Sequence, residues 1–210
     1  MHKLNRPAAA PACLANYHHG RHNWSAVSPA DKDQIRGSLK TMQQNRCAYC
    51  EQALRDDACH IEHFRQRGRY PQGTFQWSNL YLSCNRESTC GKHKDKQHYA
   101  PADLLDPCTD NPDDYLRFYS DGQIRPRADL AAPNQHRAAE TIRVFNLASP
   151  ELVAIRASEL QGWIQIAEEL QKWLEFDETE YQAELNQQLH SISGQPFETA
   201  IRHLFAHYLP

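Results

Sequence analysis

Apolar and polar residues follow two different periods along the chain, and each period predicts its own kind of element. Ser28-Pro29-Ala30-Asp31 has the composition of a helix start, with Ser as N-cap and Pro at the first helical position. Ile35, Leu39 and Met42 then recur at helical spacing. We therefore predict a helix that delivers the chain to Cys47.

The centre of the chain has the composition of short strands and turns. Residues 59–64 and 77–83 predict strands, and residues 84–98 predict a turn followed by a short helix rich in Lys and His. The proline-containing stretch over 101–127 predicts a connecting loop with a small hairpin.

The last third of the chain is predicted to be helical. Helical periods indicate helices over 138–147, over 178–189 and over 196–208, and Ser149-Pro150-Glu151 caps a longer helix that reaches Leu174. Aromatic residues at helical spacing are predicted to lie in the core: Trp163, Trp173, Phe176, Phe197, Phe205 and Tyr208. The fold class is α+β, in three parts: an N-terminal segment with its approach helix (1–40), a compact module (41–98), and a loop or hairpin followed by a helical region (99–210).

Composition and charge are those of a globular protein with one basic segment. No apolar run reaches the roughly 18 residues of a membrane span, and residues 1–11 lack a signal-peptide core, so we predict a cytoplasmic protein without membrane contact. Residues 41–98 hold nine Lys/Arg and six Asp/Glu, a net charge of +3, whereas the whole chain carries −3 and the remainder therefore −6. This distribution indicates a small phosphate-facing surface on an acidic frame, and predicts reliance on a partner for affinity.

Seven cysteines are many for a reducing compartment, and their spacing indicates a metal site rather than disulfides. Cys47 and Cys50 form a C-x2-C pair, and Cys84 and Cys90 form a wider pair after a gap of 33 residues. Four thiolates suit a closed tetrahedral zinc site, which can contribute on the order of 10 kcal/mol to folding. Two alternatives are ordinary buried cysteines, and a site in which His93 replaces Cys90.

A second group of residues has the composition of a hydrolytic metal site. His60 and Glu62 would share one face of a strand, with His63 next to them, and Asn79 precedes the second cysteine pair. A carboxylate with an imidazole can hold a hard divalent ion against a phosphate oxygen, and a free imidazole can deprotonate water. Glu62 and His63 alone are more typical of a surface ion pair, but between two cysteine pairs they favour a nuclease site.

The combined motifs resemble a known family. CAYCE (47–51), HIEHF (60–64), WSNLYLSCNR (77–86) and CGKHKDK (90–96) are similar to the HNH endonucleases. More narrowly, they resemble the PtuB-type nuclease subunits of Septu anti-phage systems, which also occur as retron effectors. The stretches 104–124 and 138–157 show the same resemblance, which implies a zinc-bound ββα-metal (HNH) module embedded in a mostly helical frame.

The resemblance implies a role for each matching residue. His63 would be the general base that activates water, and Asn79 would orient His63. Glu62 would be the first ligand of the catalytic metal and His93 the second. In many members the last ligand directly follows the second cysteine of the pair, where this chain has Gly91. His60 is expected to orient a phosphate or an arginine. The remaining candidates are predicted phosphate contacts: Arg65, Arg67, Arg69 and Lys94. For the three arginines the alternative is a solvated basic loop.

These expectations define a metal-dependent HNH endonuclease that hydrolyses phosphodiester bonds in DNA or RNA, as the effector of an anti-phage defence complex. Its cofactors would be a structural Zn²⁺ and a catalytic Mg²⁺ or Mn²⁺. The resemblance further implies a PtuA-type ATPase partner, and in the retron form a reverse transcriptase with its RNA–DNA product. One alternative is a zinc-ribbon module that binds nucleic acid without cutting it. Another is a hydrolase that uses Cys59 beside His60.

Overall fold

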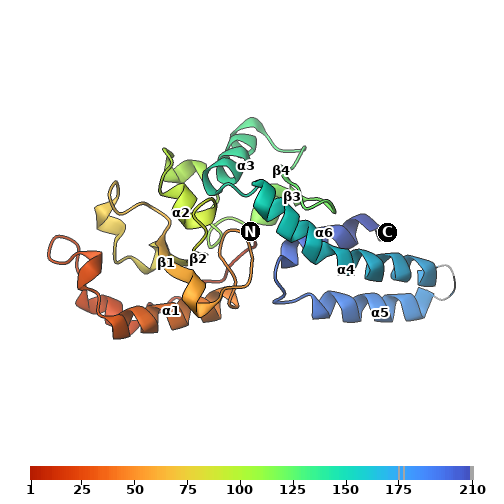
Figure 1. Cartoon of the computed structure of the whole chain (residues 1–210), viewed down its shortest axis with the longest axis horizontal. Helices are drawn as coiled ribbons and strands as arrows, with labels where there is room; N and C mark the ends of the chain where they lie inside the picture. The colour runs from red at the N-terminus through yellow and green to blue at the C-terminus, as the bar shows by residue number, and fades with distance from the viewer. Residues whose placement is uncertain (175, 177, 209–210) are drawn as a thin grey trace.

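The computed structural model describes residues 1–174, 176 and 178–208, which contain six α-helices and two small antiparallel sheets and confirm the α+β class. Figure 1 shows α1 and the first sheet at one end, helices α4, α5 and α6 at the other, and α2, α3 and the second sheet between them. The elements are α1 (Pro29–Gln43), β1 (Cys59–His63), β2 (Leu80–Cys84), α2 (Cys90–Lys94), β3 (Leu116–Phe118), β4 (Ile124–Pro126), α3 (Ala132–Phe145), α4 (Pro150–Leu174), α5 (Glu178–Ser191) and α6 (Glu198–Tyr208).

Helix α1 begins and ends as its sequence predicts. The Ser28 hydroxyl accepts a hydrogen bond from the Asp31 backbone N–H, and Pro29 occupies the first turn. Ile35 and Leu39 are fully buried, and Gln44 ends the helix in the left-handed conformation. The helix therefore brings the chain to Cys47 against the first sheet, and it packs directly on β2.

The first sheet pairs β1 with β2 in antiparallel register. Cys59 lies opposite Cys84 and His63 lies opposite Leu80. The predicted strand over 77–83 is shorter, because residues Trp77–Asn79 form a 3-10 turn and β2 begins only at Leu80. Helix α2 follows β2 and packs against it, so two strands and one short helix enclose the predicted site.

The hairpin and the following helices surround this unit. Strands β3 and β4 form the predicted hairpin. Helix α3 begins at Ala132 rather than at the predicted 138. Pro133 favours this earlier start, because N–H groups in the first turn of a helix have no partner within the helix and proline has no N–H. The described residues also contain short 3-10 helices at Ala12–Asn16, Trp24–Ala26, Asp56–Ala58, Pro71–Gly73, Trp77–Asn79, Pro101–Asp103 and Pro112–Asp114.

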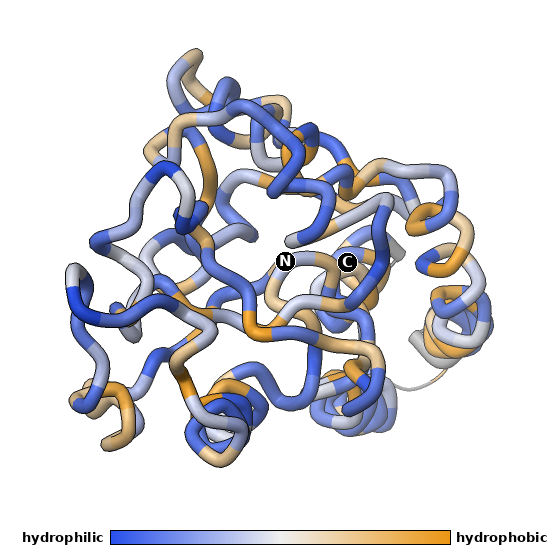
Figure 2. Tube along the Cα trace, turned by 60° about the vertical axis from the view of Figure 1, so that its left-hand side comes forward, coloured by the Kyte–Doolittle hydropathy of each residue, from blue (hydrophilic) through white to orange (hydrophobic). Residues whose placement is uncertain are grey.

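Helices α4, α5 and α6 pack together, and each carries both apolar and polar positions (Figure 2). Phe197 and Phe205 are buried as predicted and Trp163 packs against Phe205, but Phe176 is 85 % exposed, which corrects its assignment to the core. Its place in the turn between α4 and α5 leaves it without a facing helix. The side chains of Trp173 and Tyr208 lie outside the described set. Among the helices that the structure describes, none is both long and apolar enough to cross a membrane.

Buried charges tie both ends of the described chain to the first cysteine pair. The Met1 amino group pairs with the carboxylate of Glu51, whose other oxygen accepts the backbone N–H of Thr199 at 3.0 Å. Arg46, almost fully buried, pairs with Glu198 at 2.9 Å. These contacts hold α6 against the turn that carries Cys47 and Cys50.

Candidate active site and metal centre

The four cysteines predicted as zinc ligands lie together. Cys47 and Cys50 come from the turn after α1, Cys84 ends β2 and Cys90 begins α2. All four are buried, and their Sγ atoms lie within 4.8 Å of one another. Cys90 has a φ of 55°, a left-handed conformation that turns the chain back toward the other pair after the five-residue gap.

This donor set fits a structural zinc. Four sulfurs at 2.3 Å from a tetrahedral zinc are about 3.8 Å apart, so only a small contraction is required. Burial opposes ionisation of Cys47, but S–H donors from the other three cysteines outweigh it and lower the pKa of Cys47. Among the described residues no other group of three or more His, Cys, Asp or Glu is so closely clustered, so His93 does not replace Cys90 here.

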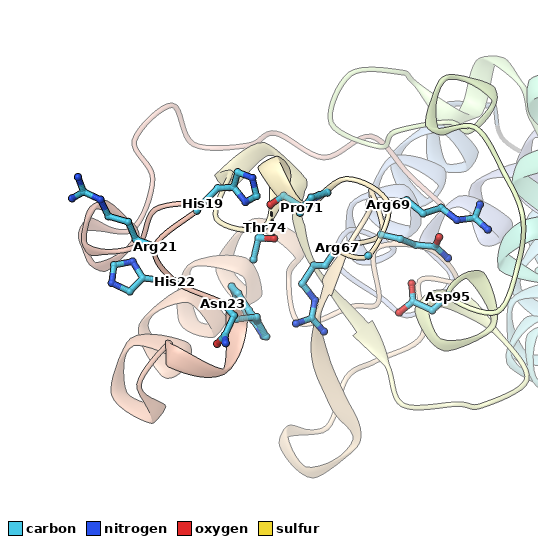
Figure 3. A pocket seen from close by; sticks show the side chains of 13 residues that line it. His19, Arg21, His22, Asn23, Arg67, Arg69, Pro71, Thr74 and Asp95 are labelled. Atoms are coloured by element: carbon cyan, nitrogen blue, oxygen red, sulfur yellow. Dashed lines mark hydrogen bonds between the residues drawn. The ribbon is translucent and has the colours of Figure 1, made fainter.

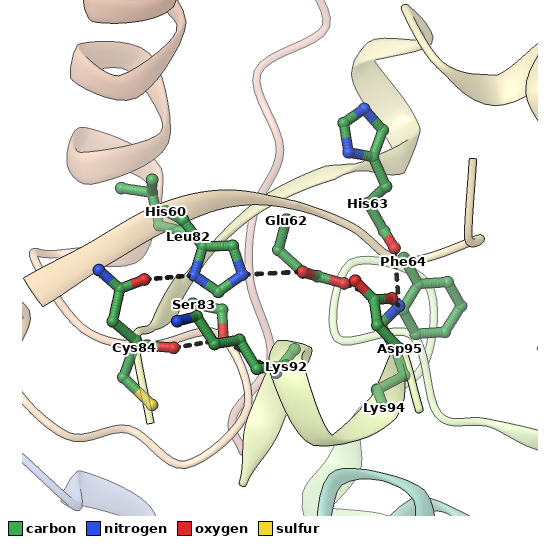
Figure 4. Close-up of polar contacts among 12 residues, drawn as sticks. His60, Glu62, His63, Phe64, Leu82, Ser83, Cys84, Lys92, Lys94 and Asp95 are labelled. Carbon is green, nitrogen blue, oxygen red and sulfur yellow. Dashed lines mark hydrogen bonds and ion pairs between the residues drawn. The ribbon is translucent and has the colours of Figure 1, made fainter. Parts of the chain in front are cut away.

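His60 and Glu62 lie on one face of β1, as predicted, and the structure adds a hydrogen bond between them (Figure 4). The Glu62 side chain is 2 % exposed, and its Oε2 lies 3.0 Å from Nε2 of His60. Burial raises the pKa of Glu62, but the hydrogen bond with His60 and the charge of Lys94 outweigh this and hold the pKa below its ordinary value. Glu62 is therefore a buried carboxylate that remains charged at neutral pH.

Lys94 is the counter-ion of Glu62 and not a surface contact. Its ammonium lies 2.7 Å from Glu62 Oε1, and it donates to the His63 carbonyl at 3.0 Å and to Asp95 Oδ1 at 2.6 Å. The side chain is fully buried. Burial lowers the pKa of Lys94, yet the charges of Glu62 and Asp95, together with Tyr99, raise it above its ordinary value. The assignment of Lys94 as a nucleic-acid contact is thus corrected, because solvent does not reach it.

His93 points toward α3 instead of toward Glu62. Its Nδ1 atom lies 2.9 Å from the Val144 carbonyl oxygen, and its Nε2 atom lies 3.4 Å from the Gln97 amide nitrogen. Both ring nitrogens are therefore engaged on the far side of α2. The physical reason is the helical period, since a residue one position before Lys94 projects about 100° away from the face that Lys94 presents to Glu62.

His63 is buried on the other side of β1 from Glu62 (Figure 4). Its Nε2 lies 3.0 Å from the Thr74 carbonyl oxygen, and the ring of Trp24 meets it edge-on at 4.5 Å between centroids. Burial, followed by the charge of Arg67, lowers the pKa of His63 to about 4. The imidazole is neutral at pH 7, and the bond to a carbonyl oxygen places its proton on Nε2 and leaves a lone pair on Nδ1.

Asn79 fixes a loop rather than the imidazole. Its side-chain oxygen accepts the backbone N–H of Arg65 at 2.7 Å, and its amide donates to the carbonyls of Arg65 and Gly73 at 3.2 and 3.0 Å. These bonds clamp both ends of the loop 65–73, whose next residue is Thr74. We predicted that Asn79 orients His63. In the structure the Thr74 carbonyl makes that contact with His63 instead.

A cavity of about 920 Å³ lies beside His63. Figure 3 shows its two walls, with His19, Arg21, His22 and Asn23 from the N-terminal segment on one side and Arg67, Arg69 and Asp95 on the other. Of the three predicted phosphate-contact arginines, Arg67 and Arg69 line this cavity, whereas Arg65 is exposed and does not line it.

Sequence reasoning missed four residues of the site. Trp24 and Thr74 reach His63 only through the tertiary fold, and no local pattern marks them. Asp95 lines the cavity and contacts Lys94, and its place in CGKHKDK was the available signal. Asn85, whose Oδ1 lies 2.8 Å from Nδ1 of His60, belongs to the stretch WSNLYLSCNR (77–86). Cys59 is buried and its pKa is raised by burial, which does not favour the Cys59 hydrolase.

The chain is similar to proteins from two kinds of anti-phage system, a retron and Septu. The chain is 29 % identical over 142 residues to the "Retron Vc95 putative HNH endonuclease" of Vibrio cholerae serotype O1 biovar El Tor. It is 29 % identical over 91 residues to the "Septu protein PtuB" of Bacillus thuringiensis, and 28 % identical over 160 residues to the protein of the same name from Bacillus mycoides strain KBAB4. The chain is thus similar to one protein named as a retron HNH endonuclease and to two named as PtuB.

The coverage of these relatives is partial. The matches cover 64 %, 42 % and 61 % of this chain, and 67 %, 34 % and 52 % of the respective relatives. No family model matches the chain. The relationship supports a nuclease of HNH type, and it leaves the activity, substrate and partners of the whole protein to be proposed from the site.

Proposed function

We propose that the protein is a metal-dependent HNH endonuclease that hydrolyses phosphodiester bonds in nucleic acid. One observation carries the proposal: the buried, neutral imidazole of His63 directly follows the buried charged carboxylate Glu62 on β1, and its partners Trp24 and Thr74 line a cavity with basic walls. A phosphodiester bond needs a base to activate water and a cation to neutralise the developing charge, and this arrangement offers a place for both.

His63 is the proposed general base. Because Nε2–H donates to the Thr74 carbonyl, Nδ1 has the lone pair that can take a proton from water. Trp24 covers one edge of the ring and limits its movement. Asn79 supports His63 indirectly, because its side chain holds the loop that leads to Thr74. The low pKa of His63 keeps it unprotonated through the neutral range, although it also makes His63 a weaker base than an ordinary imidazole.

Glu62 is the proposed protein ligand of the catalytic ion, Mg²⁺ or Mn²⁺. Its Oε1 atom pairs with the Lys94 ammonium at 2.7 Å, and its Oε2 atom faces the partly exposed imidazole of His60. A charged carboxylate oxygen beside an imidazole fits a divalent cation. When bound, such an ion would supply Lewis-acid stabilisation of the leaving oxygen. The structural zinc would be held by Cys47, Cys50, Cys84 and Cys90.

The cavity beside His63 is the proposed site of the nucleic-acid strand. Arg67 and Arg69 offer phosphate contacts from one wall, and Arg21 offers one from the other. Thr74 lines this cavity and its carbonyl oxygen contacts His63, so we place the phosphate between the walls, near the base.

The resemblance to PtuB-type subunits supports a further proposal, that the protein is the effector nuclease of an anti-phage complex. We propose a PtuA-type ATPase as partner and, if the system is of retron type, a reverse transcriptase with its RNA–DNA product. The net charge of −6 outside residues 41–98 suits docking to a protein better than contact with phosphates.

The decisive experiment compares the wild type with His63→Ala, using DNA and RNA substrates, Mg²⁺ or Mn²⁺, and any ATPase encoded beside the chain. His136→Ala is the matched control, because His136 is 59 % exposed and lies outside the site. Loss of cleavage in His63→Ala alone, with zinc content and folding unchanged, supports the proposal. Equal cleavage by all three proteins contradicts it. Binding without cleavage by all three favours the zinc-ribbon alternative.

A further inference from the structure

The face of α2 that meets Glu62 has no room for a metal-binding side chain. A Cβ atom added at Gly91 would lie 2.5 Å from Oε2 and 2.6 Å from Cδ of Glu62. One turn further, the same face presents Lys94, whose ammonium is a cation and cannot bind another. His93 is engaged with Val144 and Gln97 on the opposite side. Helix α2 therefore contributes charge compensation to Glu62 and no imidazole.

Strand β1 supplies the missing imidazole itself. His60 lies two residues before Glu62 on the same face, and the Nε2 to Oε2 distance is 3.0 Å. Two neighbouring ligands of an octahedral Mg²⁺, each about 2.1 Å from the ion, are about 3.0 Å apart. The two atoms form a hydrogen bond of that length, so a metal ion that replaces the shared proton would need little movement of either side chain. The His60 side chain is 28 % exposed, so an ion can reach it from solvent while Glu62 stays buried.

The orientation of His60 is set from behind. Its Nδ1 lies 2.8 Å from the side-chain oxygen of Asn85, which immediately follows β2. An amide oxygen there keeps a proton on Nδ1. The Nε2 atom can then release to solvent the proton that it donates to Glu62 and bind a metal ion in its place. Metal-binding imidazoles characteristically donate their second N–H to such an acceptor.

Lys94 completes the arrangement by occupying one oxygen of the carboxylate. Its ammonium faces Oε1, whereas the His60 imidazole faces Oε2. The carboxylate is therefore held in one orientation with its Oε2 edge toward His60. Because Lys94 also donates to the His63 carbonyl, it links the metal-binding residues to the backbone of the proposed base.

We propose that His60 and Glu62, both on β1, form the protein part of the divalent-cation site, that Asn85 is the positioning residue of His60, and that His93 is not a ligand. The inference deepens the proposed function and rests on it for the identity of the reaction. It does not rest on it for cation binding, which can be measured without cleavage.

The test measures Mn²⁺ affinity of the zinc-loaded protein by electron paramagnetic resonance of the free ion. His60→Ala is expected to weaken Mn²⁺ binding by more than about 10-fold, and Asn85→Ala by roughly 10-fold, as for removal of a group that orients a metal ligand. His93→Ala is the matched control and should bind Mn²⁺ as the wild type does. Zinc content and circular dichroism verify that each variant is folded, and Asn85→Ala remains informative if His60→Ala does not fold.

Unchanged affinity in His60→Ala and Asn85→Ala, weakened affinity in His93→Ala, or a wild type that binds no Mn²⁺, would overturn the inference. Nucleic-acid cleavage, measured in parallel, separates this outcome from failure of the proposed function. A wild type that binds Mn²⁺ through His60 but cuts neither DNA nor RNA would contradict the nuclease and leave the cation site standing. Cleavage of nucleic acid by a protein in which His93 proves to bind Mn²⁺ would support the nuclease and contradict the cation site at His60.

Discussion

Replacement of Lys94 by Met should show how the buried charges of the site depend on one another. The substitution keeps an apolar chain of similar length and removes only the ammonium. That group is fully buried and pairs with Glu62 at 2.7 Å, with the His63 carbonyl at 3.0 Å and with Tyr99 Oη at 3.3 Å. Its loss leaves the Glu62 carboxylate, 2 % exposed, with His60 as its remaining hydrogen-bond partner among the residues that the structure describes.

The expected cost at neutral pH is large. Removing one partner of a buried ion pair typically destabilises a protein by about 3–5 kcal/mol, because the other charge stays buried without compensation. We therefore expect Lys94→Met to lower the free energy of unfolding by about that amount at pH 7.5. Glu62→Gln combined with Lys94→Met should recover part of the loss, because no buried charge then lacks its partner.

The loss should shrink on acidification. In the wild type the pKa of Glu62 is below its ordinary 4.5, so its contribution to stability is complete above pH 4.5 and is lost as the pH falls through the lower folded value. Without Lys94, burial raises the pKa of Glu62, and protonation then stabilises the variant as the pH falls. The difference between the two proteins should thus be smaller at pH 5.5 than at pH 7.5.

Urea unfolding followed by tryptophan fluorescence, at fixed excess zinc, measures these free energies. Lys96→Met is the matched control: Lys96 is 59 % exposed and pairs with Glu87, which is 68 % exposed, so little change is expected at either pH. A loss below about 1 kcal/mol for Lys94→Met, an equal loss for Lys96→Met, or a difference that grows toward pH 5.5 would refute the reasoning.

Further predictions concern other parts of the molecule. Gly122→Ala should destabilise strongly, because a Cβ there would lie 2.3 Å from a backbone oxygen and 2.8 Å from a backbone nitrogen of α4 at a φ of +81°. Gly20→Ala, with a φ of +87° but nothing within 4 Å, should cost only about 1 kcal/mol in the same urea experiment. Glu51→Gln should lose roughly 3 kcal/mol at pH 7, since the pKa of Glu51 is lowered from 4.5 to about 2, and acid titration should show this difference disappearing between pH 4.5 and 2. The His63 imidazole should titrate near pH 4 in NMR spectra, and Arg67→Ala should raise that value; a midpoint near 6.5 in the wild type would contradict the burial argument. Removal of zinc by a chelator should expose four of the seven cysteines to a thiol reagent and lower the unfolding temperature, whereas reactivity that is independent of zinc would contradict the cluster.

Local patterns predicted the main helices and strands, with errors at some of their starts, and the pairs of residues that share one element. The helix after Ser28 has its cap and apolar spacing within 15 residues, and His60 with Glu62 needs only the two-residue period of a strand. The cysteine spacing predicted the cluster, although the gap before Cys90 left its role open until the left-handed turn at that residue was seen.

The sequence could not predict which side of a short helix faces which strand. His93 and Lys94 are adjacent, so a small error in the rotation of α2 exchanges a metal ligand for a counter-ion. Asn79 was expected at the imidazole because the sequence cannot show that a 3-10 turn directs its amide to the loop 65–73. The residues that line the cavity could not be predicted either, because residues 19–24 come close to residues 66–74 only in the folded chain.

The link between the first cysteine turn and α6 has a consequence for the order of folding. Arg46 meets Glu198 across 152 positions, and Glu51 meets the Thr199 N–H across 148. Such separations raise the contact order and delay closure, because a long loop must be restricted before the contact forms. During synthesis from the N-terminus, all the residues proposed for catalysis are made well before these partners. The nuclease half should therefore remain loosely held until α6 docks, and nucleic-acid cleavage should be a property of the late, fully closed chain.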